Sequence, residues 1–83
     1  MKYLMLAVFD SAIQAYGRPI FAQTNGQAAR SFTDEVNRPG EDNQYYKHPE
    51  DYELHYIGVF DDATGAVESN LPSCVLRGKD CKQ

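Results

Sequence analysis

The hydrophobic pattern of the first 22 residues predicts two strands of unequal length. Residues 3–9 form a continuous apolar run with an aromatic residue at each end, which is typical of a strand covered on both faces at the centre of a sheet. Residues 20–22 form a shorter apolar run directly after Pro19. Because proline cannot donate a hydrogen bond to a neighbouring strand, we expect this second run at a sheet edge.

The clearest strand pattern covers residues 52–60. Polar and apolar positions alternate in its first half, which sets Tyr52, Leu54 and Tyr56 on one face and Glu53 and His55 on the other. The Asp- and Gly-rich residues 61–65 predict a hairpin loop, and residues 66–68 a short partner strand. Residues 74–77 are expected to form a last short strand, and residues 77–83 a frayed basic tail.

One helix is predicted between the second and third strands. Thr24 or Asn25 can cap its free N–H groups, and Thr24 with Gln27 has the spacing of a capping box. Apolar residues then recur at intervals that form one stripe: Ala28, Ala29, Phe32 and Val36. Pro39 and Gly40 end the helix. The strand–strand–helix–strand–strand order predicts an α+β fold, with a small antiparallel or mixed β-sheet and one helix packed on a face.

The length of 83 residues corresponds to a single domain, residues 1–83, with a thin core. A homo-oligomer would bury more of its surface. The apolar N-terminal run ends at Asp10, too short for a signal sequence or a membrane span, so we expect a soluble protein with no membrane contact. Cys74 and Cys81 match no common zinc spacing; reduced thiols are expected, with a disulfide between them as the alternative.

No arrangement of residues indicates an enzyme, a cofactor or a metal site. Asp10, Asp61 and Asp62 follow predicted strands, and a shared Mg²⁺ site is one interpretation; solvated turns are the other, favoured because aspartate is common in turns. His48 and His55 have no supporting Cys or His nearby in the sequence, which is weak evidence for zinc. We therefore expect no catalytic residues, no metal and no cofactor.

The charge balance restricts how the chain can bind nucleic acid. Its net charge is −4, so a DNA contact would need a local patch of cations and aromatic rings rather than an overall basic surface. Tyr45 and Tyr46 lie in a predicted polar loop, residues 41–47, where they either cover an edge of the core or offer rings for stacking. The candidate DNA-binding residues are Arg18, Arg30, Lys47, Tyr45 and Tyr46.

Four segments resemble the small nonstructural protein of gokushoviruses, which are single-stranded DNA phages of the Microviridae. They are the R-P-I-F segment at residues 18–21, residues 24–37, the H-P-E-D-Y segment at residues 48–52, and residues 57–65. The resemblance implies a nonstructural protein made in the host bacterial cytoplasm. It also implies a part in the switch to single-stranded genome synthesis, or DNA binding, and it carries no catalytic residues.

Two functional hypotheses lead for this chain, and a metal-dependent nuclease that uses Asp10, Asp61 and Asp62 is the third and least favoured. The first is a phage accessory protein of single-stranded DNA genome replication or packaging that binds single-stranded DNA. The alternative is a non-enzymatic interaction module that acts on a phage or host replication protein without contacting DNA. The acidic composition agrees better with the second hypothesis, and the family resemblance with the first.

Overall fold

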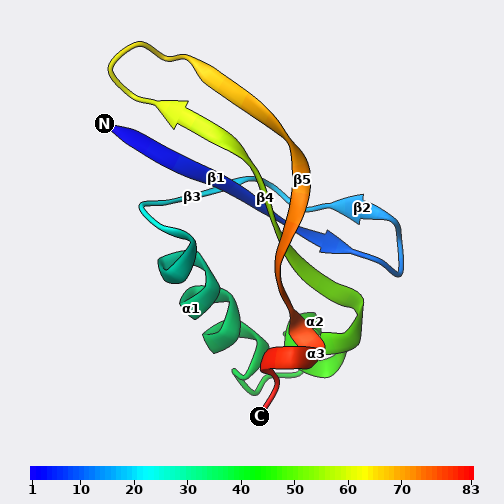
Figure 1. The fold of residues 1–83 in the computed structure, drawn as a ribbon. Helices are drawn as coiled ribbons and strands as arrows, with labels where there is room; N and C mark the ends of the chain where they lie inside the picture. The colour runs from blue at the N-terminus through cyan, green and yellow to red at the C-terminus, as the bar shows by residue number, and fades with distance from the viewer.

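A five-stranded antiparallel sheet forms the framework of the computed structural model, which describes residues 1–83 (Figure 1). The sheet order is β2-β1-β4-β5, and β3 also pairs with β1. The strands are β1 (Lys2–Asp10), β2 (Ala15–Tyr16), β3 (Ile20–Ala22), β4 (Tyr52–Asp61) and β5 (Val67–Arg77). The predicted α+β fold is confirmed, with β1 central and β3 at an edge.

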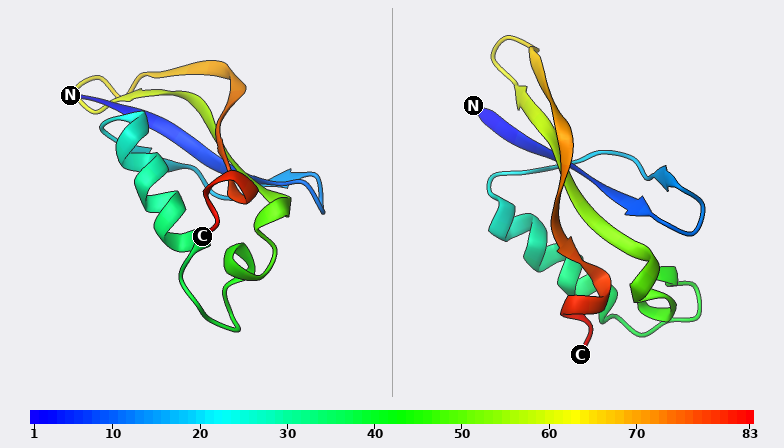
Figure 2. Two further views of the ribbon diagram at one scale, coloured as in Figure 1. Left: turned by 60° about the horizontal axis from the view of Figure 1, so that its bottom comes forward. Right: turned by 45° about the vertical axis from the view of Figure 1, so that its right-hand side comes forward.

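The helices all lie on one side of this sheet (Figure 2, left). They are α1 (Asn25–Val36), α2 (Gln44–Lys47) and α3 (Gly78–Cys81), and a 3₁₀ turn η1 (Pro49–Asp51) leads from α2 into β4. The core fills the space between α1 and the sheet, where Leu6, Leu54 and Val36 are completely buried. None of the helices is long and apolar enough to cross a membrane.

The start of α1 follows from the predicted capping residues. The Thr24 hydroxyl accepts a hydrogen bond from the Gln27 N–H at 3.0 Å. The Gln27 side chain reaches back to accept from the N–H of Gln23 at 2.8 Å, one residue before the expected partner. Ala28, Phe32 and Val36 are buried along the inner side of α1, as the apolar stripe predicted. Capping and apolar spacing together therefore fix where α1 starts and which side it buries.

The second half of the chain contains more regular structure than the pattern predicted. The two short strands predicted at residues 66–68 and 74–77 are instead parts of the single long strand β5 (Val67–Arg77), with register irregularities opposite β4. The sequence did not predict this strand because it contains several polar residues and Pro72. An edge strand tolerates both, since nearly all the side chains of β5 are in solvent. The strand β2 was also missed, since it has only two residues and follows a turn in which Gln14 has φ of 55°.

The C-terminal segment contains the short helix α3, in the residues for which the sequence predicted a basic tail. Gly78 is buried, and a Cβ there would clash with the carbonyl oxygen of Pro49, so only glycine fits this close approach. The Asn37 side chain donates to the carbonyl of Cys81 at 3.0 Å and accepts from the N–H of Gln83 at 2.7 Å. These contacts fix α3 against the end of α1.

Candidate functional site

The two faces of the sheet have different surroundings. Along β1, Leu4, Leu6 and Val8 belong to the core beneath α1. Because side chains alternate along a strand, Tyr3, Met5, Ala7 and Phe9 lie on the opposite face, which no helix covers (Figure 2). We call this second surface the open face. Strand register assigns the following further residues to it: Tyr16, Phe21, Glu53, His55, Phe60, Val67, Cys74 and Arg77.

One half of the open face carries an aromatic cluster built from three strands. The Phe9 ring lies 4.9 Å from the Tyr16 ring and is stacked 5.4 Å from the His55 imidazole, measured between centroids. The Tyr16 hydroxyl and His55 Nδ1 are hydrogen-bonded at 2.8 Å, and His55 Nε2 contacts a Glu53 carboxylate oxygen at 2.8 Å. Only 13% of the His55 side chain is accessible, and both its ring nitrogens have hydrogen-bond partners. The cluster is therefore held in one arrangement.

The other half of the open face carries a second aromatic pair. Phe21 on β3 and Phe60 on β4 have ring centroids 5.7 Å apart. Phe60 is the register partner of both Tyr3 and Val67, so these four residues form one continuous apolar area. Phe21 is 56% exposed and Val67 equally so. Large apolar side chains left this accessible on either side of Phe60 are characteristic of a contact surface.

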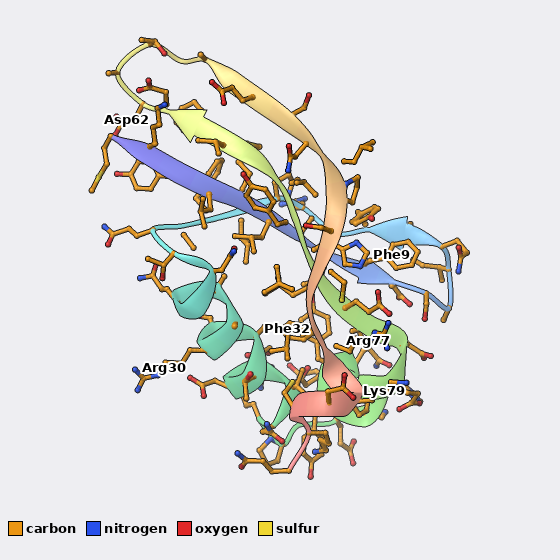
Figure 3. All side chains as sticks on the ribbon, viewed as in Figure 1. Phe9, Arg30, Phe32, Asp62, Arg77 and Lys79 are labelled. Carbon is orange, nitrogen blue, oxygen red and sulfur yellow. The ribbon has the colours of Figure 1, made fainter.

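Few cations border the open face. Arg18 is exposed in the connection between β2 and β3, and it makes no ion pair. Arg77 lies across from Glu53, with its Nε 3.7 Å from a carboxylate oxygen, so its charge is partly balanced (Figure 3). The N-terminal ammonium is hydrogen-bonded to Asp62 at 2.7 Å, and this contact raises the pKa of the ammonium group. Arg18 is thus an exposed guanidinium without an ion-pair partner, in the connection that joins the strands of Tyr16 and Phe21.

The five residues predicted as a DNA site come from three separate elements. Arg18 precedes β3, while Arg30 is on the outer side of α1 and points away from the sheet (Figure 3). Tyr45, Tyr46 and Lys47 are consecutive in α2. The structure thus groups three of the five and separates Arg18 and Arg30 from them.

Tyr45 packs against the core rather than facing solvent. Its ring centroid lies 4.5 Å from that of Tyr52 and 6.1 Å from that of Phe32. Burial raises the pKa of the Tyr45 hydroxyl, with a smaller contribution from the negative charge of Glu35. This packing matches the interpretation that the Tyr45 ring covers an edge of the core.

Lys47 is exposed, whereas Tyr46 is partly buried like Tyr45. The Lys82 ammonium lies 3.6 Å from the centroid of the Tyr46 ring, a cation–π contact between α2 and the C-terminus. Beside it is an open hollow of about 450 Å³, lined by Gly40, Glu41, Tyr46 and Lys47. Glu41 sits in the same hollow as Lys47, so this surface has mixed charge.

The acidic residues considered for a shared Mg²⁺ site lie far apart. In the β1–β4 ladder, Asp10 pairs with Tyr52 at one end and Lys2 pairs with Asp61 at the other. Eight residue steps at about 3.3 Å each separate these ends by roughly 26 Å. Asp10, Asp61 and Asp62 therefore cannot bind one ion, and each is in a turn or strand end, as the solvated-turn interpretation holds.

The aromatic residues of the open face were not found from the sequence as a site. Phe9, Phe21 and Phe60 are in apolar runs in which every position reads as core, so nothing marks the uncovered face. The one available signal was the short β3 run after Pro19, since an edge strand with two large apolar residues leaves one of them exposed. The site became visible only when the positions of all helices were known.

Comparisons with known proteins give one match. No curated protein and no solved structure matches this chain. A family model described as "Phage ORF5 protein" matches residues 3–81, nearly the whole chain. That span includes β5 and α3, which lie outside the segments used for the gokushovirus resemblance. The chain therefore belongs to the Phage ORF5 protein family.

Proposed function

We propose that this phage protein is an accessory factor of single-stranded DNA genome replication in the host cytoplasm, and that it binds single-stranded DNA on the open face. The observation that supports the proposal most is the uncovered sheet surface with two groups of aromatic rings, Phe9–Tyr16 and Phe21–Phe60. Rings on an open sheet can stack on unpaired bases, and such stacking needs little sequence preference.

The charge distribution suits this mode of binding better than a phosphate-dominated one. The net charge of −4 cannot attract a duplex over a wide surface. Arg18 beside β3 supplies one unpaired cation at the rim of the aromatic area, and stacking supplies about 1–3 kcal/mol per base. We therefore expect binding with a shallow dependence on salt, since few counterions are released.

Fluorescence anisotropy with a labelled mixed-sequence oligonucleotide at low salt tests the proposal. Phe21→Ala and Arg18→Glu, both at the open face, should each raise Kd roughly tenfold or more, as expected for losing a stacked ring or a phosphate contact. Arg30→Glu is the matched charge reversal on the outer side of α1 and should leave Kd within about twofold, a margin typical of a distant surface change.

The same titrations distinguish the two candidate surfaces. A loss of binding in Arg30→Glu, Tyr46→Ala and Lys47→Glu, with Phe21→Ala unaffected, would move the contact to α1 and α2. No binding of the unmodified protein to single-stranded DNA at low salt would refute the DNA proposal altogether.

The accessible surface favours a second candidate, an interaction module that works as a homo-oligomer or on a phage or host replication protein. The chain exposes 5392 Å², whereas a monomer of this mass typically exposes about 5,000 Å². The excess agrees with the bare sheet face and the long exposed strand β5. Molar mass measured by light scattering over a range of concentrations tests this second candidate. The mass of a monomer at every concentration, in the wild type and in Phe21→Thr alike, would argue against self-association through this face.

A further inference from the structure

The open face also brings together three residues with the chemistry of a zinc site. Glu53 and His55 are two positions apart on β4, so both side chains emerge on the open face. Cys74 on β5 is the register partner of His55. One carboxylate oxygen, one imidazole nitrogen and the Cys74 sulfur all lie within 4.8 Å of one another. We propose that Glu53, His55 and Cys74 bind one Zn²⁺ ion.

The distances require only small side-chain movements for coordination. Zinc bonds of about 2.0–2.3 Å in a tetrahedron place ligand atoms roughly 3.3–3.6 Å apart. The Glu53 oxygen and His55 Nε2 are now 2.8 Å apart, and the widest separation in the group is within 4.8 Å. Rotating the Cys74 side chain inward and opening the Glu53–His55 contact suffices, because Cys74 is exposed and unpaired. An oxygen, nitrogen and sulfur set suits zinc better than calcium or magnesium.

The partners of the three ligands are arranged to support an ion. His55 Nδ1 is hydrogen-bonded to the Tyr16 hydroxyl. When Nε2 binds zinc, Nδ1 must carry the ring proton, and the Tyr16 oxygen can then accept it, since a hydroxyl both donates and accepts. Arg77 is next to the other Glu53 oxygen, which orients the carboxylate. Binding displaces the thiol proton of Cys74 to solvent, and water completes the tetrahedron on the exposed side.

The sequence did not indicate this site because its ligands are distant in the chain. His55 and Cys74 are separated by a hairpin and an irregular stretch of β5, so no compact Cys/His motif exists. A second group, His48, Glu50 and Asp51, is also close in space, but it lacks a thiol and is in an exposed turn. Its His48 and the second cysteine, Cys81, provide matched controls.

Cobalt titration of the reduced full-length chain tests the proposal, since Co²⁺ bound by a thiolate absorbs in the near ultraviolet. Wild type, Cys81→Ser and His48→Gln should develop this absorption and lose it when Zn²⁺ displaces the cobalt. Cys74→Ser should not develop it, and the Zn²⁺ affinity of His55→Gln should fall at least about tenfold. Tyr16→Phe removes only the support of the ligand and should cost about 10–100-fold in affinity.

A measurement on the unmodified protein avoids any effect of the substitutions on folding. Zinc should protect Cys74 but not Cys81 from alkylation, as read by mass spectrometry of the peptides. Equal protection of the two cysteines, no thiolate absorption in the wild type, or an undiminished absorption in Cys74→Ser would each overturn the zinc site.

Discussion

The two faces of the sheet are made by the same strands, yet they have different roles. On the covered face, Leu6 and Leu54 are completely enclosed by α1 and its neighbours. On the open face, Phe9 and Tyr16 contact each other and the polar His55, and no helix covers them. Apolar residues on the first face stabilise the fold by burial, whereas Tyr16, Phe21 and Val67 on the second remain partly hydrated and are available to a ligand.

The difference shows how a thin core coexists with abundant apolar residues. Hydrophobic residues make up 42% of the chain, but only seven of them are buried. A single 12-residue helix is too short to cover the whole sheet, and the hairpin end of β4 and β5 extends beyond it (Figure 1). Part of the remaining apolar surface, including Tyr16, Phe21 and Val67, is therefore on the open face. The variants below separate stability from binding.

The largest difference is expected between two leucines. Leu54→Ala removes a completely buried side chain beneath α1 and should lower the free energy of unfolding by about 2–5 kcal/mol. Leu71→Ala changes the same atoms on β5, where the side chain is 89% exposed, and should cost less than about 0.5 kcal/mol. Urea denaturation followed by circular dichroism measures both. Similar losses in the two variants would mean that β5 is covered in solution.

The second-largest loss of stability is expected at Asn43, the buried polar residue on the covered side of the sheet. The Asn43 amide donates to the carbonyls of Glu35 and Arg38 at 2.8 and 2.9 Å. Its side-chain oxygen accepts from the N–H groups of Tyr45 and Tyr46, which caps α2. Asn43→Ala leaves these groups without partners and should cost about 2–3 kcal/mol.

Asn70→Ala is the matched control, because Asn70 is exposed on β5 and makes no side-chain hydrogen bond. Urea denaturation of the two asparagine variants gives the comparison. If they were equally stable, the junction of α1 and α2 would contribute nothing to the fold.

Asn43 also illustrates what the sequence did and did not predict. The helix at Thr24 and the strands at residues 3–9 and 52–60 were predictable because local spacing alone specifies them. The position of α3 depends on contacts with residues far away in the chain, such as Asn37 with Cys81. The role of Asn43 depends on carbonyl groups at the end of α1, those of Glu35 and Arg38. A polar segment whose position depends on such contacts shows no hydrophobic periodicity in the sequence.

The open face was unpredictable for a different physical reason. In residues 3–9 both alternating sets are apolar, so the pattern predicts burial on both sides. Burial of the set that contains Phe9 would need a second helix or a partner, and the chain supplies only α1, α2 and α3, all on one side. The candidate cations on α1 and α2 were predicted from residue type alone, which cannot tell that their elements lie beneath the sheet.

A pH titration sharpens the comparison on the covered side. Burial raises the pKa of both Tyr45 and Tyr52, and the nearby Asp10 carboxylate adds to the shift of Tyr52. Both tyrosines hold their protons more tightly in the folded chain. Their contribution to the free energy of unfolding is therefore complete at pH values below the ordinary tyrosine pKa of about 10. It is lost as the pH rises through the folded-state pKa, because the unfolded chain then ionises first.

Urea midpoints measured from pH 8 to 11 should therefore fall at the alkaline end, and Tyr45→Phe with Tyr52→Phe should flatten that fall. Phenylalanine keeps the ring packing against Phe32 but has no proton to lose. An unchanged alkaline slope in the double variant would place the responsible groups elsewhere in the chain.

The smallest effect on stability is expected on the open face. Phe21→Thr keeps a residue that favours strands but removes a ring that is 56% exposed and contacts Phe60 from one side only. The free energy of unfolding should change by about 0.5 kcal/mol or less in dilute solution, although the proposed DNA binding should weaken as for Phe21→Ala. Denaturation at two protein concentrations checks this result. A loss that appears only at high concentration would show that Phe21 is buried between copies of the chain, and a loss as large as that of Leu54→Ala at both concentrations would mean that the two faces do not differ as the structure indicates.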